Sequence, residues 1–233
     1  MKIRQVLNII FLCIGMLILI SACTPTRNLH QGQYMLTKNK VIADKKEIPV
    51  KDIIYVVRPI PNRKFLQLFY WKVGIYQSMM PSDTTKDNKA KKWMRKNFGE
   101  PIVMLDTTLV EYSNSQIQLF MKNKGYFQAK VDYEIQTKKK KTKVKYFIKA
   151  GQACIIQQIK YNIEDPKIAE LIYKDTVNCV LKIGNNFDVD EFSEERSRMT
   201  YYLNNLGYFN FTEDYITYKI DSNLTDYTVK VKI

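Results

Sequence analysis

The amino-acid sequence predicts an α+β protein in which a small module with the element order β-α-α-β-β occurs twice. The first observation is an internal repeat, because Ile117–Val131 reads IQLFMKNKGYFQAKV and Met199–Glu213 reads MTYYLNNLGYFNFTE. Gly125 and Gly207 lie 82 positions apart, a spacing that indicates duplicated small domains rather than a solenoid of short repeats. The second observation is the composition, with 45% hydrophobic and 26% charged residues, which is typical of a globular protein.

A secretory signal peptide is predicted at residues 1–22. Lys2 and Arg4 precede a 15-residue apolar stretch, which is shorter than the roughly 20 residues that a transmembrane helix needs. The residues that follow, Ile-Ser-Ala-Cys, resemble the bacterial lipobox and end at Cys23. The resemblance implies cleavage before Cys23 and acylation of that cysteine, with palmitate as the expected fatty acid. A plain secretory peptide and a signal anchor are the two alternatives.

The predicted anchor determines where the mature chain is expected. More than one acyl chain on a single residue holds a protein stably at a membrane, so residues 23–33 are expected to form a lipidated tether outside the cytoplasm. The 37 Lys and Arg residues exceed the 23 Asp and Glu residues, for a net charge of +14. This charge favours anionic partners such as lipid headgroups, lipopolysaccharide or nucleic acid. The expected location argues against nucleic acid.

The four cysteines leave one pairing question open. Cys13 belongs to the signal peptide and Cys23 to the lipidation site, so only Cys154 and Cys179 can form a disulfide in an oxidising envelope. Both lie among apolar neighbours, and cysteine is also a common small buried residue. The sequence therefore permits a bridge between them without indicating one.

The first module is predicted to occupy residues 34–150, with its opening strand at 34–42 and its first helix at 50–58. The spacing of Thr108 and Glu111 matches a capping box at the start of the second helix. Gly125 suits the left-handed position that ends this helix. Alternating residues predict the hairpin that follows, namely Ala129, Val131, Tyr133 and Ile135 in one strand and Val144, Tyr146 and Ile148 in the other. The run Lys138 to Lys141 is expected as a solvated turn between them.

An insertion at about 60–98 separates the two helices of the first module. It contains an apolar segment that is crowded with aromatic residues on all sides of a predicted helix, including Phe69, Trp71 and Tyr76. A polar loop at 81–88 and a basic helical segment at 89–98 follow. The aromatic segment either packs against its own domain or contacts the membrane interface or a partner.

The second module is predicted at residues 151–233. Alternating Ile159, Tyr161 and Ile163 indicate its opening strand, and Pro166 suits the first turn of its first helix. Asp188 is the expected N-cap of the second helix, with Glu191 as its reciprocal partner. The buried stripe of that helix is predicted to comprise Phe192, Met199, Tyr202, Leu203 and Leu206. The closing hairpin is indicated by Ile216, Tyr218 and Ile220, followed by Tyr227, Val229, Val231 and Ile233.

This element order, with Gly-Tyr-Phe directly after the second helix, resembles the POTRA domain, the polypeptide-transport-associated module of outer-membrane assembly factors. The matching segments are 99–131 and 184–211. They contain the two expected fold-defining turns, Gly125, Tyr126 and Phe127 in the first module and Gly207, Tyr208 and Phe209 in the second. Together with the lipobox and the insertion, the pattern resembles the N-terminal part of the TamL lipoproteins of the BamA/TamA superfamily.

The family resemblance also implies a further partner. Members of this superfamily continue into a sixteen-stranded outer-membrane barrel, whereas the segments assigned above leave too little chain for a porin-like barrel, so none is expected here. Either the chain is an N-terminal fragment of a longer barrel protein, or it is a short lipoprotein that cooperates with a barrel made elsewhere. The sequence does not separate these two cases.

The resemblance implies a periplasmic part of a factor that assembles or translocates outer-membrane proteins. Such a factor docks unfolded client polypeptides or partner subunits by β-augmentation, because a three-stranded sheet leaves edges with unpaired backbone groups. The expected docking residues lie on the hairpin strands, namely Ala129, Val131, Tyr133, Ile135, Ile216, Tyr218 and Ile220. The expected location is the outer membrane, with the domains facing the periplasm, since residues 24–27 contain no acidic export signal.

Two other classes of function have weaker support. An enzyme is not expected, because His30 is the only histidine and no glycine-rich phosphate loop is present. Apart from the covalent lipid, no cofactor, metal or catalytic residue is predicted, and the carboxylates at 188–195 are attributed to capping and the helix dipole. The alternative function is a passive envelope lipoprotein that binds lipopolysaccharide or a protein complex through its basic surface, above all through residues 89–98.

Overall fold

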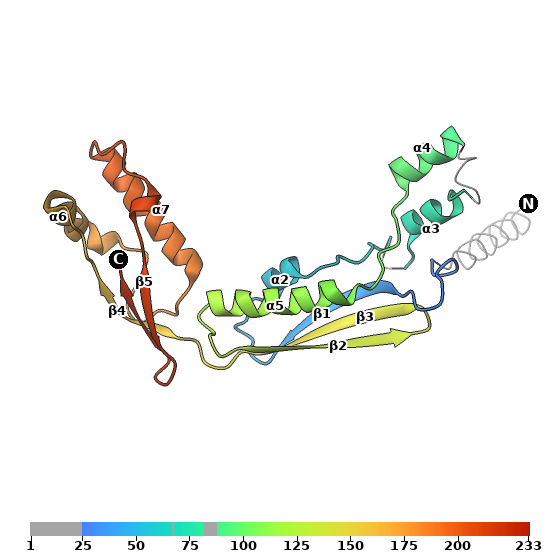
Figure 1. The fold of residues 1–233 in the computed structure, drawn as a ribbon, viewed down its shortest axis with the longest axis horizontal. Coiled ribbons are helices and arrows are strands. Elements are labelled where there is room, and N and C mark those ends of the chain that lie inside the picture. The colour runs from blue at the N-terminus through green and yellow to red at the C-terminus, as the bar shows by residue number, and fades with distance from the viewer. Residues whose placement is uncertain (1–24, 67, 82–87) are drawn as a thin grey trace, which may run out of the picture. The chain divides into compact units, whose positions relative to one another are not determined.

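The computed structural model describes residues 25–66, 68–81 and 88–233 (Figure 1). The predicted signal peptide, Cys23 and most of the polar loop expected at 81–88 lie outside the described residues. Within the described part the architecture is α+β, with two three-stranded sheets whose strand orders are β1-β3-β2 and β4-β6-β5. The predicted fold class is therefore confirmed, with the order β-α-α-β-β in two copies and a helical insertion in the first.

The first module follows the chain order predicted for it. Its elements are β1 (Met35–Ala43), α2 (Val50–Ile53), the 3-10 turn η1 (Ile54–Val56), α3 (Trp71–Ser78), α4 (Lys89–Phe98), α5 (Thr107–Asn123), β2 (Lys130–Lys138) and β3 (Lys141–Lys149). Strand β3 is central in its sheet. The backbone bonds Met35 N to Lys140 O and Asp44 N to Ile148 O advance in the same direction along both strands, so β1 runs parallel to β3.

Two helix boundaries in the first module differ from the prediction. The helix expected at 50–58 ends at Ile53 and continues only as the turn η1. Its sequence is rich in β-branched and aromatic residues, and Pro59 disfavours a helical residue before it. Helix α5 starts at Thr107, where the Asp106 carboxylate accepts bonds from the N–H groups of Thr108 (2.9 Å) and Leu109 (3.2 Å). The N-cap is thus Asp106 and not Thr108.

The insertion packs against its own module. Its helix α3 starts only at Trp71, and the segment before it closes a short turn in which Phe65 pairs with Phe69. Tyr70 and Val73 are buried in a small apolar cluster with Leu29 and Met35. The three aromatic residues singled out in the sequence, Phe69, Trp71 and Tyr76, are half-buried. Helix α4 has the bounds that the sequence predicts and packs beside α3 (Figure 1).

The second module repeats the same topology without the insertion. Its elements are β4 (Ile155–Lys160), α6 (Pro166–Asp175), the 3-10 turn η3 (Thr176–Asn178), α7 (Val189–Asn205), the 3-10 turn η4 (Glu213–Tyr215), β5 (Lys219–Asn223) and β6 (Thr228–Lys232). The central strand β6 is parallel to β4 and antiparallel to β5. An apolar cluster joins Ile172 of α6 to Met199 and Leu203 of α7.

The prediction for the second module is accurate at its helix starts and inaccurate at its opening strand and at the end of its second helix. Pro166 is the first residue of α6, and the Asp188 side chain caps α7 by accepting from the Asp190 N–H. However, β4 ends at Lys160, so Tyr161 and Ile163 lie beyond the strand. In α7, Leu206 was placed on the buried stripe, but this residue follows the helix and its exposed fraction is 47%.

The two Gly-Tyr-Phe triplets end equivalent helices in the same way. Helices α5 and α7 each have 17 residues, and Gly125 and Gly207 follow them with φ angles of +84° and +98°. The Tyr126 N–H donates to the Met121 carbonyl (2.9 Å), and the Tyr208 N–H donates to the Leu203 carbonyl (3.1 Å). These are the six-to-one bonds of a Schellman motif, which requires a residue that tolerates positive φ at the glycine position.

The chain divides into two compact units that do not coincide with the two modules. One unit comprises the residues up to 40 together with 57–113 and 133–146. The other comprises 41–56, 114–132 and 147–233. The second unit therefore includes the C-terminal part of α5 and the start of β2 as well as the whole second module.

Candidate functional site

The outer edge of β1 is partly covered by the segment that leads into α5. The Leu36 N–H donates to the Val103 carbonyl (2.9 Å), and the Leu105 N–H donates to the Tyr34 carbonyl (2.8 Å). Met35 and Met104 form the antiparallel bridge between these two bonds. This end of β1 therefore has few free backbone groups for another strand.

The outer edge of β4 is covered in the corresponding way, by the loop that leads into α7. Ile156 donates its N–H to the Asn185 carbonyl and accepts from the Gly184 N–H, each at 2.8 Å. The Phe187 N–H donates to the Cys154 carbonyl, also at 2.8 Å. In both modules, the connection between the two helices thus protects the edge of the first strand.

The other edges are formed by β2 and β5, which end their sheets opposite β1 and β4. Among the described residues, no backbone segment pairs with the outer side of either strand. The start of β2 is approached by two amides of α5, because Asn114 Nδ2 donates to the Val131 carbonyl (3.1 Å) and Gln118 Nε2 donates to the Ala129 carbonyl (3.4 Å). The accessible part of the β2 edge is therefore its second half, residues 133–138.

The predicted docking residues of the first module lie on or beside β2. Ala129 precedes the strand and is buried, as is Val131. Tyr133 and Ile135 are half-buried, and Glu134 between them is exposed. The Thr137 and Thr142 hydroxyls are 3.1 Å apart across the hairpin. Because β2 is the last strand of its sheet, residues 133–138 have a neighbouring strand, β3, on one side only.

Two of the predicted docking residues of the second module are not on a strand. The sequence predicts a strand through Ile216, Tyr218 and Ile220, but this segment follows the turn η4 at 213–215 and β5 begins only at Lys219. Ile216 is buried with an exposed fraction of 6%. The Tyr218 hydroxyl donates to the Phe192 carbonyl (3.1 Å), so this side chain contributes to the core of the module. Only Ile220, which is 43% exposed, lies on β5 itself.

The first Gly-Tyr-Phe triplet contacts the second module within the second compact unit. The Cys154 N–H donates to the Gly125 carbonyl at 2.9 Å, and a Cβ at Gly125 would lie 2.7 Å from the Phe187 carbonyl oxygen. The ring of Phe127 packs against that of Phe187, with 5.3 Å between their centroids. The turn thus joins the end of α5 to the loop that caps β4.

An ion pair reinforces this junction. Lys124 Nζ lies 2.7 Å from Asp188 Oδ2 and 2.8 Å from Asp190 Oδ2, at the start of α7. Burial by itself lowers the pKa of Lys124, but the hydrogen bonds to Asp188 and Asp190 outweigh it and raise the pKa above its ordinary value. Asp188 therefore caps α7 and also binds Lys124 at the end of α5 in the preceding module.

The second triplet has an open environment instead. No atom lies within 4 Å of the position that a Cβ at Gly207 would take. Phe209 is 82% exposed, and the turn lines a shallow pocket together with Ile168 and Tyr215. The Gly-Tyr-Phe triplet of the first module therefore packs against the neighbouring module, whereas the triplet of the second module serves mainly to end its helix.

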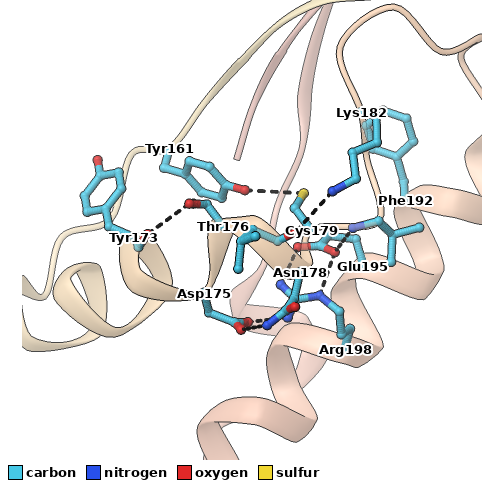
Figure 2. A network of polar contacts seen from close by, with 12 residues as sticks. Tyr161, Tyr173, Asp175, Thr176, Asn178, Cys179, Lys182, Phe192, Glu195 and Arg198 are labelled. Atoms are coloured by element: carbon cyan, nitrogen blue, oxygen red, sulfur yellow. Dashed lines mark hydrogen bonds and ion pairs between the residues drawn. The ribbon is translucent and has the colours of Figure 1, made fainter.

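A buried charge network in the second module was missed by the sequence analysis. Figure 2 shows Glu195 and Arg198 of α7 beside Asp175 at the end of α6. Arg198 is bound to Glu195 at 2.8 and 2.9 Å and also to Asp175. The hydrogen bonds to Glu195 are the largest factor that raises the pKa of Arg198. Burial favours a higher pKa for Asp175, but its bonds to Arg198 and Asn178 lower it overall.

The role assigned to Glu195 was wrong. Its carboxylate was attributed to the helix dipole, but the residue has an exposed fraction of 0% and accepts a bond from the Val180 N–H (2.8 Å). Glu195 lies three residues after Phe192 and four residues before Met199, and this spacing places it on the buried stripe of α7. That spacing was a usable signal for its burial.

The two cysteines of the second module are free and buried. The Tyr161 hydroxyl donates to Cys179 Sγ at 3.4 Å (Figure 2), and burial raises the pKa of both thiols. Within the described part of the chain, no group of three or more His, Cys, Asp or Glu side chains is placed to hold a metal ion. A search of the same residues finds no helix with the length and apolar character needed to cross a membrane.

Comparison with known proteins finds a family match for part of the chain. Residues 67–151 match the POTRA family, described as a surface antigen variable number repeat. The match begins in the insertion and ends after β3, so it includes α5, the first Gly-Tyr-Phe triplet and the hairpin of the first module. It supports the resemblance to POTRA domains for that segment. No match is found among curated proteins.

Solved structures of low sequence identity are also similar to the chain. BamA from Haemophilus ducreyi lacking POTRA domains 1–3 has 13% identity and a TM-score of 0.39, over 85% of this chain and 28% of that chain. POTRA1-2 of the periplasmic domain of Omp85 from Anabaena has 8% identity and a TM-score of 0.36, over 87% of this chain and 96% of that one. Haemophilus influenzae BamA POTRA3-5 has 12% identity and a TM-score of 0.31, over 88% and 99%.

Proposed function

We propose that this chain is the POTRA portion of a factor that assembles or translocates outer-membrane proteins, of the TamL lipoprotein type. It holds unfolded clients or partner subunits by adding their extended segments to its sheets. The observation that carries the proposal is the unpaired outer edge of β2 over residues 133–138, at the end of a sheet whose other edge is partly covered. The POTRA match over residues 67–151 includes this strand.

Strand addition suits a client that has not yet folded. Its affinity comes from main-chain hydrogen bonds, so binding depends little on which side chains the client carries. The exposed side chains of β2 include Glu134, Gln136 and Lys138. Charged residues at an open edge discourage pairing between copies of the same protein while leaving the backbone groups available.

The proposed location follows from the N-terminal sequence. Acylation of Cys23 would tether the chain to the outer membrane, and the modules would face the periplasm, where unfolded clients pass. The proposed role needs no catalytic residue, metal or cofactor beyond this covalent lipid, because it consists of non-covalent binding.

Site-specific photocrosslinking tests the proposed edge. A photoreactive residue in place of Gln136, on β2, is expected to crosslink an unfolded outer-membrane protein supplied from urea. The matched control is the same substitution at Lys143, which is exposed on the neighbouring central strand β3 and should crosslink weakly. Equal yields at both positions, or none at Gln136 while the client still binds, would contradict docking at this edge.

Salt separates this proposal from the alternative of a passive lipoprotein with a basic surface. Binding through lysine and arginine side chains weakens steeply as salt rises, because mobile ions screen exposed charges. Strand addition relies on backbone hydrogen bonds and should retain most of its crosslinking yield at Gln136 in high salt. A yield that disappears in high salt, together with binding of lipopolysaccharide, would support the alternative instead.

A further inference from the structure

Helix α4 of the insertion is amphipathic, and its apolar side is not buried. At about 100° per residue, Trp93, Met94 and Phe98 lie within an arc of about 140°. The opposite side carries only cations, namely Lys89, Lys91, Lys92, Arg95 and Lys96. No residue of α4 is buried, and Trp93 and Phe98 are 60% and 45% exposed.

The aromatic residues of α4 form an ordered apolar surface. The rings of Trp93 and Phe98 meet edge to face, with their centroids 5.6 Å apart. On the cationic side, Arg95 Nη1 donates to the Met79 carbonyl at the end of α3 (2.9 Å). A contact on the cationic side holds α4 to α3, while Trp93, Met94 and Phe98 on the apolar side remain 60%, 37% and 45% exposed among the described residues.

The insertion is also attached to the start of the described chain. Gln77 Nε2 of α3 donates to the Pro25 carbonyl at 2.7 Å, and Leu29 is buried against Tyr70 and Val73. Pro25 is two residues after the predicted lipidation site at Cys23, and two residues span at most about 7 Å. Acylation at Cys23 would therefore bring the insertion to the membrane surface.

We infer that α4 is an interfacial membrane helix that binds the surface of an anionic phospholipid bilayer. A helix with Trp and Phe on one side and Lys and Arg on the other lies in the plane of such an interface, with its apolar side among the acyl chains and its cations at the headgroups. Two anchors, an acyl group and α4, would then fix the orientation of the first compact unit on the membrane. This surface is separate from the β2 edge proposed for clients, so each can fail without the other.

Depth-dependent fluorescence quenching tests the inference in the full lipidated chain reconstituted into vesicles. The substitution Trp71→Phe leaves Trp93 as the only tryptophan. Brominated acyl chains should quench Trp93 strongly in vesicles of phosphatidylglycerol and phosphatidylcholine in equal parts, and weakly in phosphatidylcholine alone. If Trp71→Phe lowers the melting temperature, the difference between the wild type and Trp93→Phe provides the same measurement.

Two matched variants control the experiment. The first variant moves the tryptophan to the other compact unit by combining Trp71→Phe, Trp93→Phe and Phe209→Trp. Its tryptophan takes an aromatic position that is 82% exposed and should stay unquenched. Replacing Lys91 and Lys92 by Glu should lower the membrane-bound population of α4 by at least about tenfold, because each cation near an anionic surface contributes about a fivefold preference.

Several results would overturn the inference. Trp93 that remains unquenched in anionic vesicles, or is quenched equally in phosphatidylcholine alone, excludes an anionic bilayer as the ligand. Equal quenching at Phe209→Trp indicates non-specific adsorption of the whole chain. Trp93 that is protected from an aqueous quencher in cell envelopes, yet not quenched by brominated lipid, indicates that a protein covers α4.

Discussion

The two modules keep a polar residue buried at the same position of the same helix, but they use different chemistry. Ser113 in α5 and Glu195 in α7 are 82 positions apart, and both have an exposed fraction of 0%. The Ser113 hydroxyl accepts from the Arg58 N–H and the Glu195 carboxylate from the Val180 N–H, each at 2.8 Å. In both modules the donor lies two residues after the 3-10 turn that follows the first helix. The buried acceptor therefore holds the connection between the helices.

The difference lies in what each acceptor requires. A hydroxyl is neutral and is satisfied by local backbone groups, as Ser113 is by Arg58 and Leu109. A buried carboxylate needs a compensating charge, which Arg198 supplies to Glu195. The same connection between helices is therefore held in two ways, by hydrogen bonds alone in the first module and by a charge network in the second.

The largest expected effect comes from breaking the network. Glu195→Ala removes a carboxylate from between Arg198 and the Val180 N–H, and should lower the free energy of unfolding by about 3–5 kcal/mol. The matching substitution Ser113→Ala leaves the Arg58 N–H without its acceptor and should cost about 1–2 kcal/mol. Urea denaturation followed by circular dichroism measures both.

An exposed neighbour is the control for this pair. Glu194 is exposed, so Glu194→Ala should change the free energy of unfolding by less than about 0.5 kcal/mol. If Glu195→Ala costs no more than Ser113→Ala, the two acceptors are energetically equivalent and the proposed distinction between the modules is wrong.

A smaller difference is expected between the two glycine turns. At Gly125 a methyl group meets the Phe187 carbonyl at 2.7 Å in addition to the positive φ, so Gly125→Ala should cost about 3 kcal/mol. At Gly207 only the φ angle opposes a side chain, so Gly207→Ala should cost about 1 kcal/mol. Equal losses of unfolding free energy in the two variants, measured by the same urea denaturation, would show that the contact with the Phe187 carbonyl does not contribute.

The smallest expected effect is a dependence of the stability of the second module on pH. The pKa of Asp175 is lowered in the folded protein, so its stabilising contribution is present above its ordinary pKa of about 4 and is lost as pH falls through the lower folded value. The difference in unfolding free energy between the wild type and Asp175→Asn should therefore narrow from pH about 5 to about 2. A constant difference over this range would show that Asp175 does not contribute to the loss of stability at low pH.

Comparing the two copies of the internal repeat predicts the start of α5 better than the residue pattern of α5 alone. Asp188 was predicted as the cap of α7, and shifting it by the 82-residue spacing identifies Asp106, which does cap α5. The capping-box spacing at Thr108 instead predicts a helix start that is two residues too late. The β5 strand shows the opposite limit, because Ile216 and Tyr218 alternate like a strand, but Ile216 is buried after the turn η4 and Tyr218 bonds to α7.

By itself the sequence determined the fold class, both Gly-Tyr-Phe helix ends, the cap of α7 and the bounds of α4. These features depend on local spacing and on residues with special backbone preferences, which act over a few neighbouring positions. Only the tertiary structure decided which sheet edges are open, since the segments that cover β1 and β4 are loops whose bonds join residues far apart in the chain. It also decided that Gly125 is packed and Gly207 is not, because a glycine looks the same in the sequence whether or not another backbone lies against it.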